Sequence, residues 1–110
     1  MATAEDFFAI DMRVGTVVEA EAFPEARKPS IKLAIDFGPE LGIKRSSAQL
    51  TVHYTPERLV GRQVVAAINL GSRRIAGFNS EVLVLGGMPT ATEVVLLALE
   101  RPVANGTRIG

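Results

Sequence analysis

Two adjacent arginines and a phenylalanine are the residues of this sequence whose chemistry points most directly to a ligand. Arg73, Arg74 and Phe78 stand in the segment NLGSRRIAGFNSEVLVLGG, residues 69–87, which ends in an apolar run. Guanidinium groups bind phosphates through two parallel hydrogen bonds and stack on unpaired bases, and a phenylalanine ring is a stacking platform. The segment therefore predicts a binding loop. The alternative is a surface loop whose arginines face water while the ring packs beneath them.

Composition excludes many kinds of catalytic and metal site. The chain has no cysteine and a single histidine, His53, so it lacks thiolate nucleophiles, disulfides and multi-histidine metal sites. His53 has no acid and nucleophile at the spacing of a catalytic triad. An acidic cluster lies along a strand and the loop that follows it, and consists of Glu19, Glu21 and Glu25. This arrangement favours a solvated acidic face over a general acid and base pair. We expect no catalytic residue, no cofactor and no bound metal.

The formal charge is zero, but it is unevenly distributed. Residues 1–25 carry six acidic side chains against Arg13 and are net −5, residues 26–74 are net +6, and the remainder is net −1. A basic middle segment favours a polyanion or an acidic partner, with a solvated surface as the alternative. No apolar segment approaches the roughly 20 residues that span a bilayer, and the N-terminus is acidic where a secretory signal is basic. The sequence thus predicts a soluble, cytoplasmic protein without membrane insertion.

Alternation of apolar and polar residues predicts a single all-β domain over residues 1–110. In IKLAIDF, the side chains of Ile31, Leu33, Ile35 and Phe37 share one face, as in a half-buried strand. Strands do not alternate with long helices, which favours a small barrel. The apolar run TEVVLLALE is typical of a strand buried on both faces, with a short buried helix as the alternative. The expected strands are residues 13–23, 31–37, 45–52, 62–70, 81–87 (ended by paired glycines) and 92–100, with a long connection over 71–80.

Capping and turn residues predict the remaining elements. Thr3 is the expected cap of a short N-terminal helix within residues 1–10, and Thr55 with Pro56 is expected to start a short helix between the third and fourth strands. Asn105-Gly106 lies between β-prone flanks, which is typical of a type I′ turn. We therefore expect a C-terminal hairpin over residues 100–110.

Three motifs, in order along the chain, carry a family resemblance. DMRVGTVVEAEAFPEARKPSIKLAIDFG, SSAQLTVHYTPERLVGRQVVAAINL and RRIAGFNSEVLVLGG resemble the tRNA-binding OB-fold domains that stand alone or are appended to methionyl-tRNA synthetases and the EMAP-II cytokine. The resemblance runs from Asp11 to Gly110 and is closer to a stand-alone, export-related chaperone of that family. It implies a five-stranded OB-fold barrel, no catalysis, and a homodimer joined through segments outside the barrel. It also implies binding of unfolded preproteins that pass to a SecA-type export ATPase, or alternatively of tRNA.

The resemblance also enlarges the candidate site. In the tRNA-binding relatives the segment that matches residues 69–80 lines the face that receives RNA. Those relatives commonly have Ser-Gln-Gly-Met where this chain has Ser80-Glu81-Val82, and a carboxylate there would repel phosphate while holding guanidinium groups or meeting a basic peptide. In the peptide-binding alternative, the two arginines flank a groove for apolar segments of an unfolded chain. The predicted site residues are Ser47, Asn69, Arg73, Arg74, Ile75, Phe78, Ser80 and Glu81.

The apolar side chains near both ends predict the dimer contacts. A short terminal helix is unstable without packing, so it must cover an open barrel end in its own chain or bury against a second copy. The resemblance favours the second copy. The predicted interface residues are Phe7, Phe8, Ile10, Val103 and Ile109.

Overall fold

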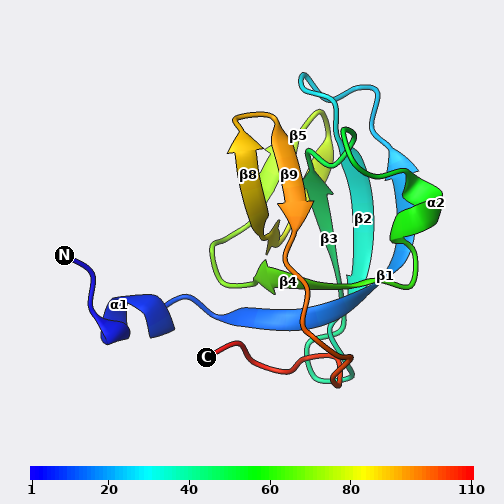
Figure 1. The fold of residues 1–110 in the computed structure, drawn as a ribbon. Coiled ribbons are helices and arrows are strands. Elements are labelled where there is room, and N and C mark those ends of the chain that lie inside the picture. Colours follow the sequence, from blue (N-terminus) through cyan, green and yellow to red (C-terminus); the bar gives the residue numbers. More distant parts are fainter.

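One antiparallel sheet organises the chain (Figure 1). The computed structural model describes residues 1–110, and the five strands of its sheet lie in the order β3-β2-β1-β4-β7. The first four expected strands are confirmed. Strand β3 starts earlier than the expected residue 45, and it ends earlier than the expected residue 52 because the chain turns after residue 50. The strands of this sheet are β1 Met12–Ala22, β2 Ile31–Asp36, β3 Ile43–Ala48, β4 Gln63–Ala67 and β7 Leu83–Val84.

The sheet closes on itself between β3 and the residues that precede β7. The backbone N–H of Glu81 donates to the carbonyl of Arg45 at 2.8 Å, and the hydroxyl of Ser46 donates to the carbonyl of Val82 at 2.9 Å. Little backbone pairing joins these two edges, so side chains complete the closure. The outcome is the nearly closed, mostly β, five-stranded barrel of the OB fold that the sequence predicts.

Alternating apolar residues fill the barrel. Ile31, Leu33, Ile35 and Phe37 are all buried, as the period of two predicts. Gly15 lies in β1 where the strand crosses this core. A Cβ atom at this position would lie 2.6 Å from Ile35 Cγ2 and 2.8 Å from the Phe37 ring, so a larger residue would force the core apart.

A second, smaller core lies over β1 and β4, where the C-terminal segment packs against them. Val103 and Ile109, which the sequence predicts at a dimer interface, pack here within their own chain and are partly buried. The buried members of this core are Met12, Val14, Val65 and Ala67.

The expected C-terminal hairpin does not form. The N–H of Thr107 donates to the carbonyl of Ala104 at 3.1 Å, which closes a turn around Asn105-Gly106. Only Gly106 has a positive φ, of 90°, whereas a type I′ turn needs one at both central residues. The residues after the turn pair with β1 instead, since the N–H of Ile109 donates to the carbonyl of Met12 at 2.9 Å.

The expected long connection over residues 71–80 contains a hairpin. Its strands are β5 Arg73–Ile75 and β6 Phe78–Ser80. Ala76 and Gly77 form the turn with φ of 45° and 82°, as in a type I′ turn. Alanine rarely adopts a positive φ, which is why the pattern of residue types gave no hairpin signal here.

The last two expected strands form in part, since β7 lies within residues 81–87 and a second hairpin contains a strand within residues 92–100. This hairpin pairs β8 Gly86–Thr90 with β9 Glu93–Leu96. The paired glycines start β8 rather than ending a strand. A Cβ atom at Gly86 would lie 2.5 Å from the carbonyl oxygen of Val95, so glycine is what allows the two strands to approach this closely. The apolar run is likewise not buried on both faces, since Val95 is exposed and its neighbours are only partly buried.

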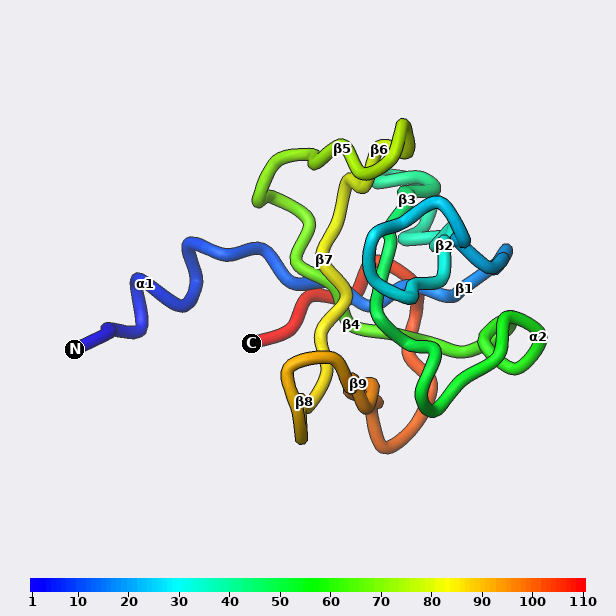
Figure 2. Tube along the Cα trace, turned by 90° about the horizontal axis from the view of Figure 1, so that it is seen from above, coloured from blue at the N-terminus to red at the C-terminus, as the bar shows by residue number.

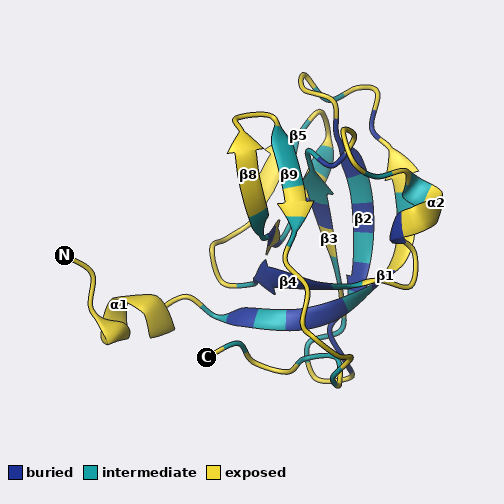
Figure 3. Ribbon diagram, viewed as in Figure 1, coloured by how far each residue is buried: buried dark blue, intermediate teal, exposed yellow.

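Two short helices complete the fold. Helix α1, Ala4–Phe8, projects away from the barrel (Figures 1 and 2), and all its residues are exposed (Figure 3). Thr3 caps it as predicted, with Asp6 in a reciprocal capping box. Helix α2, Pro56–Leu59, follows Thr55, whose side chain makes no capping hydrogen bond. Neither helix has the length and apolar composition needed to cross a membrane.

Candidate binding groove

A groove of about 430 Å³ lies beside the β5–β6 hairpin. It is bounded by that hairpin, the end of β3, the loop between β1 and β2, and residues of β7, β8 and β9. Its apolar lining includes Ile75, Leu83 and Met88, and the last two are 52% and 62% exposed. Its cationic lining is Arg27, Lys28 and Arg73, and no carboxylate lines it.

The groove contains three of the predicted site residues and several that sequence analysis missed. The predicted site residues that line it are Ser47, Arg73 and Ile75. Arg74 does not, because successive side chains of a strand point to opposite faces. Arg27, Lys28, Leu83 and Met88 were missed. The basic pair in EARKPS was the one available signal, since only the fold brings Leu83 and Met88 beside it.

Ser80 supports the groove from beneath. It is buried, and its hydroxyl oxygen accepts a hydrogen bond of 3.1 Å from the backbone N–H of Ser47. This bond ties β6 to the end of β3, so Ser80 positions a lining residue. The structure therefore gives Ser80 a role in the framework of the groove.

Glu81 is held by backbone contacts next to the hairpin. Its carboxylate accepts a hydrogen bond of 2.9 Å from the N–H of Arg45, while its own N–H donates to the Arg45 carbonyl at 2.8 Å. It forms no ion pair with Arg73 or Arg74. Glu81 thus completes the barrel closure and leaves its charge without a cationic side chain as partner.

The side chain of Asn69 is hydrogen-bonded to the N-terminal arm, which comprises residues 1–11. Its side-chain oxygen accepts from the N–H of Asp11 at 2.8 Å, and its amide donates to the carbonyl of Ala9 at 2.9 Å. Arg108 adds a bond of 3.1 Å to the carbonyl of Phe8. Asn69 therefore orients the arm and does not line the groove.

An ion pair fixes the base of the same arm. Arg13 Nε donates to Asp11 Oδ1 at 2.7 Å, and both side chains are about one quarter exposed, at 25% and 26%. The hydrogen bond from Arg13 holds the pKa of Asp11 below its ordinary value, against the opposing effect of burial, and the charge of Arg108 adds to the lowering. The same pair raises the pKa of Arg13. Both groups are therefore ionised at neutral pH.

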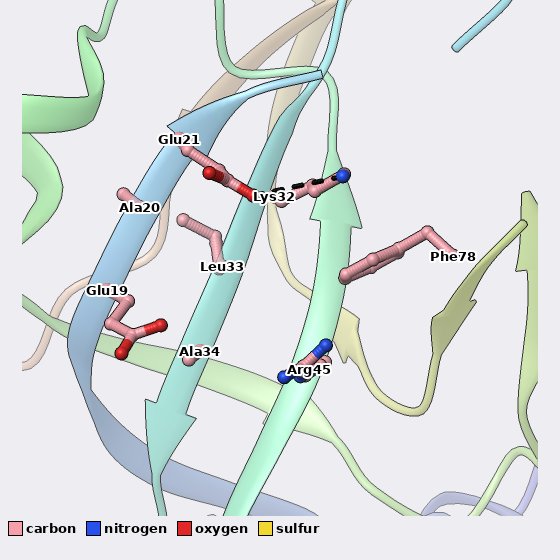
Figure 4. A pocket seen from close by; sticks show the side chains of 8 residues that line it. All are labelled: Glu19, Ala20, Glu21, Lys32, Leu33, Ala34, Arg45 and Phe78. Carbon is pink, nitrogen blue, oxygen red and sulfur yellow. Dashed lines mark ion pairs between the residues drawn. The ribbon is translucent and has the colours of Figure 1, made fainter. Parts of the chain in front are cut away.

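Phe78 faces a second depression, the strand-face hollow, on the outside of β1, β2 and β3 (Figure 4). Its ring lies edge to face with Phe23 at 5.5 Å between centroids. The ammonium of Lys32 lies 4.6 Å from the Phe23 centroid and 5.3 Å from that of Phe78. This stack joins the loop after β1 to the β5–β6 hairpin. The hollow has a volume of about 310 Å³ and also contains Glu19, Glu21 and Arg45.

Comparison with known proteins assigns the family. The model of the tRNA_bind family, described as a tRNA binding domain, matches residues 12–108. The chain belongs to this family. The match covers all five strands of the barrel and both hairpins, so the tRNA-binding domain fold includes every element that lines the groove. The resemblance found in the sequence motifs is thereby confirmed.

The solved structures that are similar to this chain include two chaperones. Chaperone CsaA of Bacillus anthracis is 57% identical with a TM-score of 0.95, over 100% of this chain and 99% of that one. The CsaA chaperone protein of Picrophilus torridus is 42% identical with a TM-score of 0.91, and both chains are covered completely. Both are similar to this chain over its whole length, α1 and the C-terminal segment included.

Among curated proteins, methionine–tRNA ligases match. That of Methanococcoides burtonii is 36% identical over 107 residues, which are 97% of this chain and 15% of the ligase. That of Thermotoga maritima is 33% identical over 97% of this chain and 16% of the ligase. The chain thus spans about 15% of the length of such ligases.

Proposed function

We propose that the groove holds extended segments of non-native polypeptides, so that the chain acts as a CsaA-like chaperone for unfolded preproteins and not as an enzyme. The observation that carries the proposal is the meeting of an apolar and a cationic lining in one groove without a carboxylate. The thioether of Met88 adapts to apolar side chains of varied shape. Arginine and lysine supply donors for main-chain carbonyls and carboxylates of the bound segment.

Apolar burial supplies most of the binding energy in this proposal. Each 100 Å² of apolar surface removed from water contributes about 2.5 kcal/mol before the cost of ordering the bound segment. Such binding delays folding or aggregation but performs no transport. Transfer of the client to a SecA-type export ATPase stays a prediction, as does the cytoplasmic location.

Truncation of the apolar lining tests the proposal. We expect Leu83→Ser/Met88→Ser to weaken binding of a labelled unfolded-preprotein peptide by about tenfold in fluorescence anisotropy, since two apolar contacts are lost. The matched control is Val52→Ser/Val60→Ser, because these residues are 60% and 50% exposed and line neither the groove nor the strand-face hollow. Equal losses in both variants would count against the groove.

A second candidate function is tRNA binding. The cationic lining and the family match favour it. Salt separates the two candidates, because affinity for a polyanion falls steeply as salt rises while apolar burial does not. Binding of tRNA that exceeds peptide binding and collapses between 50 and 200 mM salt would promote this candidate over the chaperone.

We further propose that the chain forms a homodimer through its N-terminal arm. Phe7, Phe8 and Ile10 are 44%, 50% and 40% exposed, and the helix that carries the first two projects away from the barrel (Figure 2). A five-residue helix with such a surface gains stability from a second copy. The dimer would place two grooves on one particle and raise the affinity for a long client.

Light scattering after size-exclusion chromatography tests the dimer. We expect twice the chain mass for the wild type and for Val60→Asp, and a single chain mass for Phe8→Asp. Val60 matches Phe8 in exposure, at 50%, but lies next to α2. A wild type of single chain mass would refute the dimer.

A further inference from the structure

The strand-face hollow has a charge pattern unlike that of the groove. Strand β1 contributes Glu19 and Glu21, whose side chains extend over the hollow in Figure 4. Across the sheet, Glu21 is in register with Lys32, and Glu19 with Ala34. Their carboxylates therefore form one edge of this face.

These carboxylates are only weakly neutralised. Lys32 Nζ lies 3.8 Å from Glu21 Oε1, and the Glu21 side chain is 73% exposed, so water screens the pair. Glu19 forms no ion pair. The ammonium of Lys32 is also engaged by the rings of Phe23 and Phe78.

Glu81 places a third carboxylate beside the same face. Its oxygen is fixed by the N–H of Arg45, a residue that lines the hollow. A neutral glutamine could accept the same hydrogen bond, so the geometry requires the oxygen but not the charge. The charge of Glu81 can therefore act on a ligand while its oxygen serves the closure.

An OB-fold barrel typically receives nucleic acid on this outer face of its second and third strands and on the adjoining loops. A phosphate chain bound there would meet three carboxylates and only two cations, Lys32 and Arg45. Of these cations, Lys32 is already paired with Glu21. We propose that Glu19, Glu21 and Glu81 exclude polyanions from the strand face and so set a preference for polypeptide over RNA. This inference rests on the proposed function of the groove and names what selects its ligand class.

Isosteric neutralisation tests this selection. We expect Glu19→Gln/Glu21→Gln to bind labelled tRNA about five- to tenfold more tightly than the wild type at 50 mM salt, because two repulsions at close range are removed. Addition of Glu81→Gln should increase the gain further by about twofold, with a smaller loss of stability than Glu81→Ala causes. Affinity for the unfolded-preprotein peptide should stay within twofold in all variants.

Glu57→Gln/Glu100→Gln is the matched control. It changes the net charge by the same amount, and neither residue lines the hollow or the groove. A control that gains as much tRNA affinity as Glu19→Gln/Glu21→Gln would overturn the selection, since overall charge would then explain the effect. Absence of any gain in the variants would also overturn it. The peptide titration of the wild type decides the proposed function separately.

Discussion

Glu81 forms hydrogen bonds with both backbone groups of Arg45, as a residue of a neighbouring strand does. Its N–H reaches the Arg45 carbonyl at 2.8 Å, and its side-chain oxygen takes the N–H of the same residue at 2.9 Å. One residue thereby satisfies both backbone groups of its partner across the barrel closure. The two faces with contrasting charge, the groove and the strand-face hollow, meet near this pair, since Ser47 lines one and Arg45 the other.

Glu81→Ala should destabilise the protein by about 0.5–1.5 kcal/mol, because the N–H of Arg45 loses an acceptor that carries a charge. Glu81→Gln should cost less than half of that. Urea unfolding at one fixed protein concentration measures both values. Equal stability of the alanine variant and the wild type would show that water replaces the carboxylate.

Ala76→Asn should stabilise the protein by about 0.5–1 kcal/mol. Alanine at φ 45° is strained, whereas Asn-Gly is a preferred pair for a type I′ turn. The matched substitution Ala91→Asn, in the other hairpin connection, should have no such effect because Ala91 lacks a positive φ. Thermal unfolding measures the difference, and a lower melting temperature for Ala76→Asn would contradict the turn geometry.

Stability should depend on Asp11 in acid. Its pKa in the folded chain lies below the ordinary value of 3.8, so its carboxylate stabilises the fold above that pH. The contribution is lost as the pH falls through the lowered pKa of the folded chain. Asp11→Asn should therefore be less stable than the wild type at pH 7, and the gap should close as the pH falls below the ordinary pKa value of 3.8 and through the lowered pKa of the folded chain. A gap that is constant with pH would contradict the ion pair with Arg13.

Asn69→Ala should loosen the N-terminal arm. The N–H of Asp11 would lose its acceptor, so its hydrogen exchange should accelerate by at least about tenfold. Asn79→Ala is the control, because Asn79 is exposed in β6 and makes no side-chain bond to the arm. Unchanged exchange at Asp11 would mean that Asn69 does not hold the arm.

The fold was largely predictable because strong local patterns determine it. The period of two in residues 31–37 and the cap at Thr3 were confirmed. The β5–β6 hairpin escaped prediction because Ala76 adopts a positive φ that its residue type disfavours. Hairpin β8–β9 escaped because glycines that usually end strands here allow close contact between two strands.

The site was predictable only in part, for a different reason. Family resemblance pointed to the arginine segment, and the structure brings Ser47, Arg73 and Ile75 to the groove. Residue type does not show whether a polar side chain faces a ligand or its own backbone. The side chains of Ser80 and Asn69 make backbone contacts in the framework. The opposing faces of Arg73 and Arg74 likewise follow from strand alternation and not from their shared chemistry.

The most direct test of ligand binding in the groove uses the methyl groups of the three methionines. Met88 lines the groove, Met12 is buried in the second core, and Met1 is exposed at the chain end. In methyl NMR spectra titrated with an unfolded-preprotein peptide, we predict a shift of the Met88 signal with Met12 and Met1 unmoved. Peptide binding that leaves the Met88 signal in place would contradict the groove as the binding site.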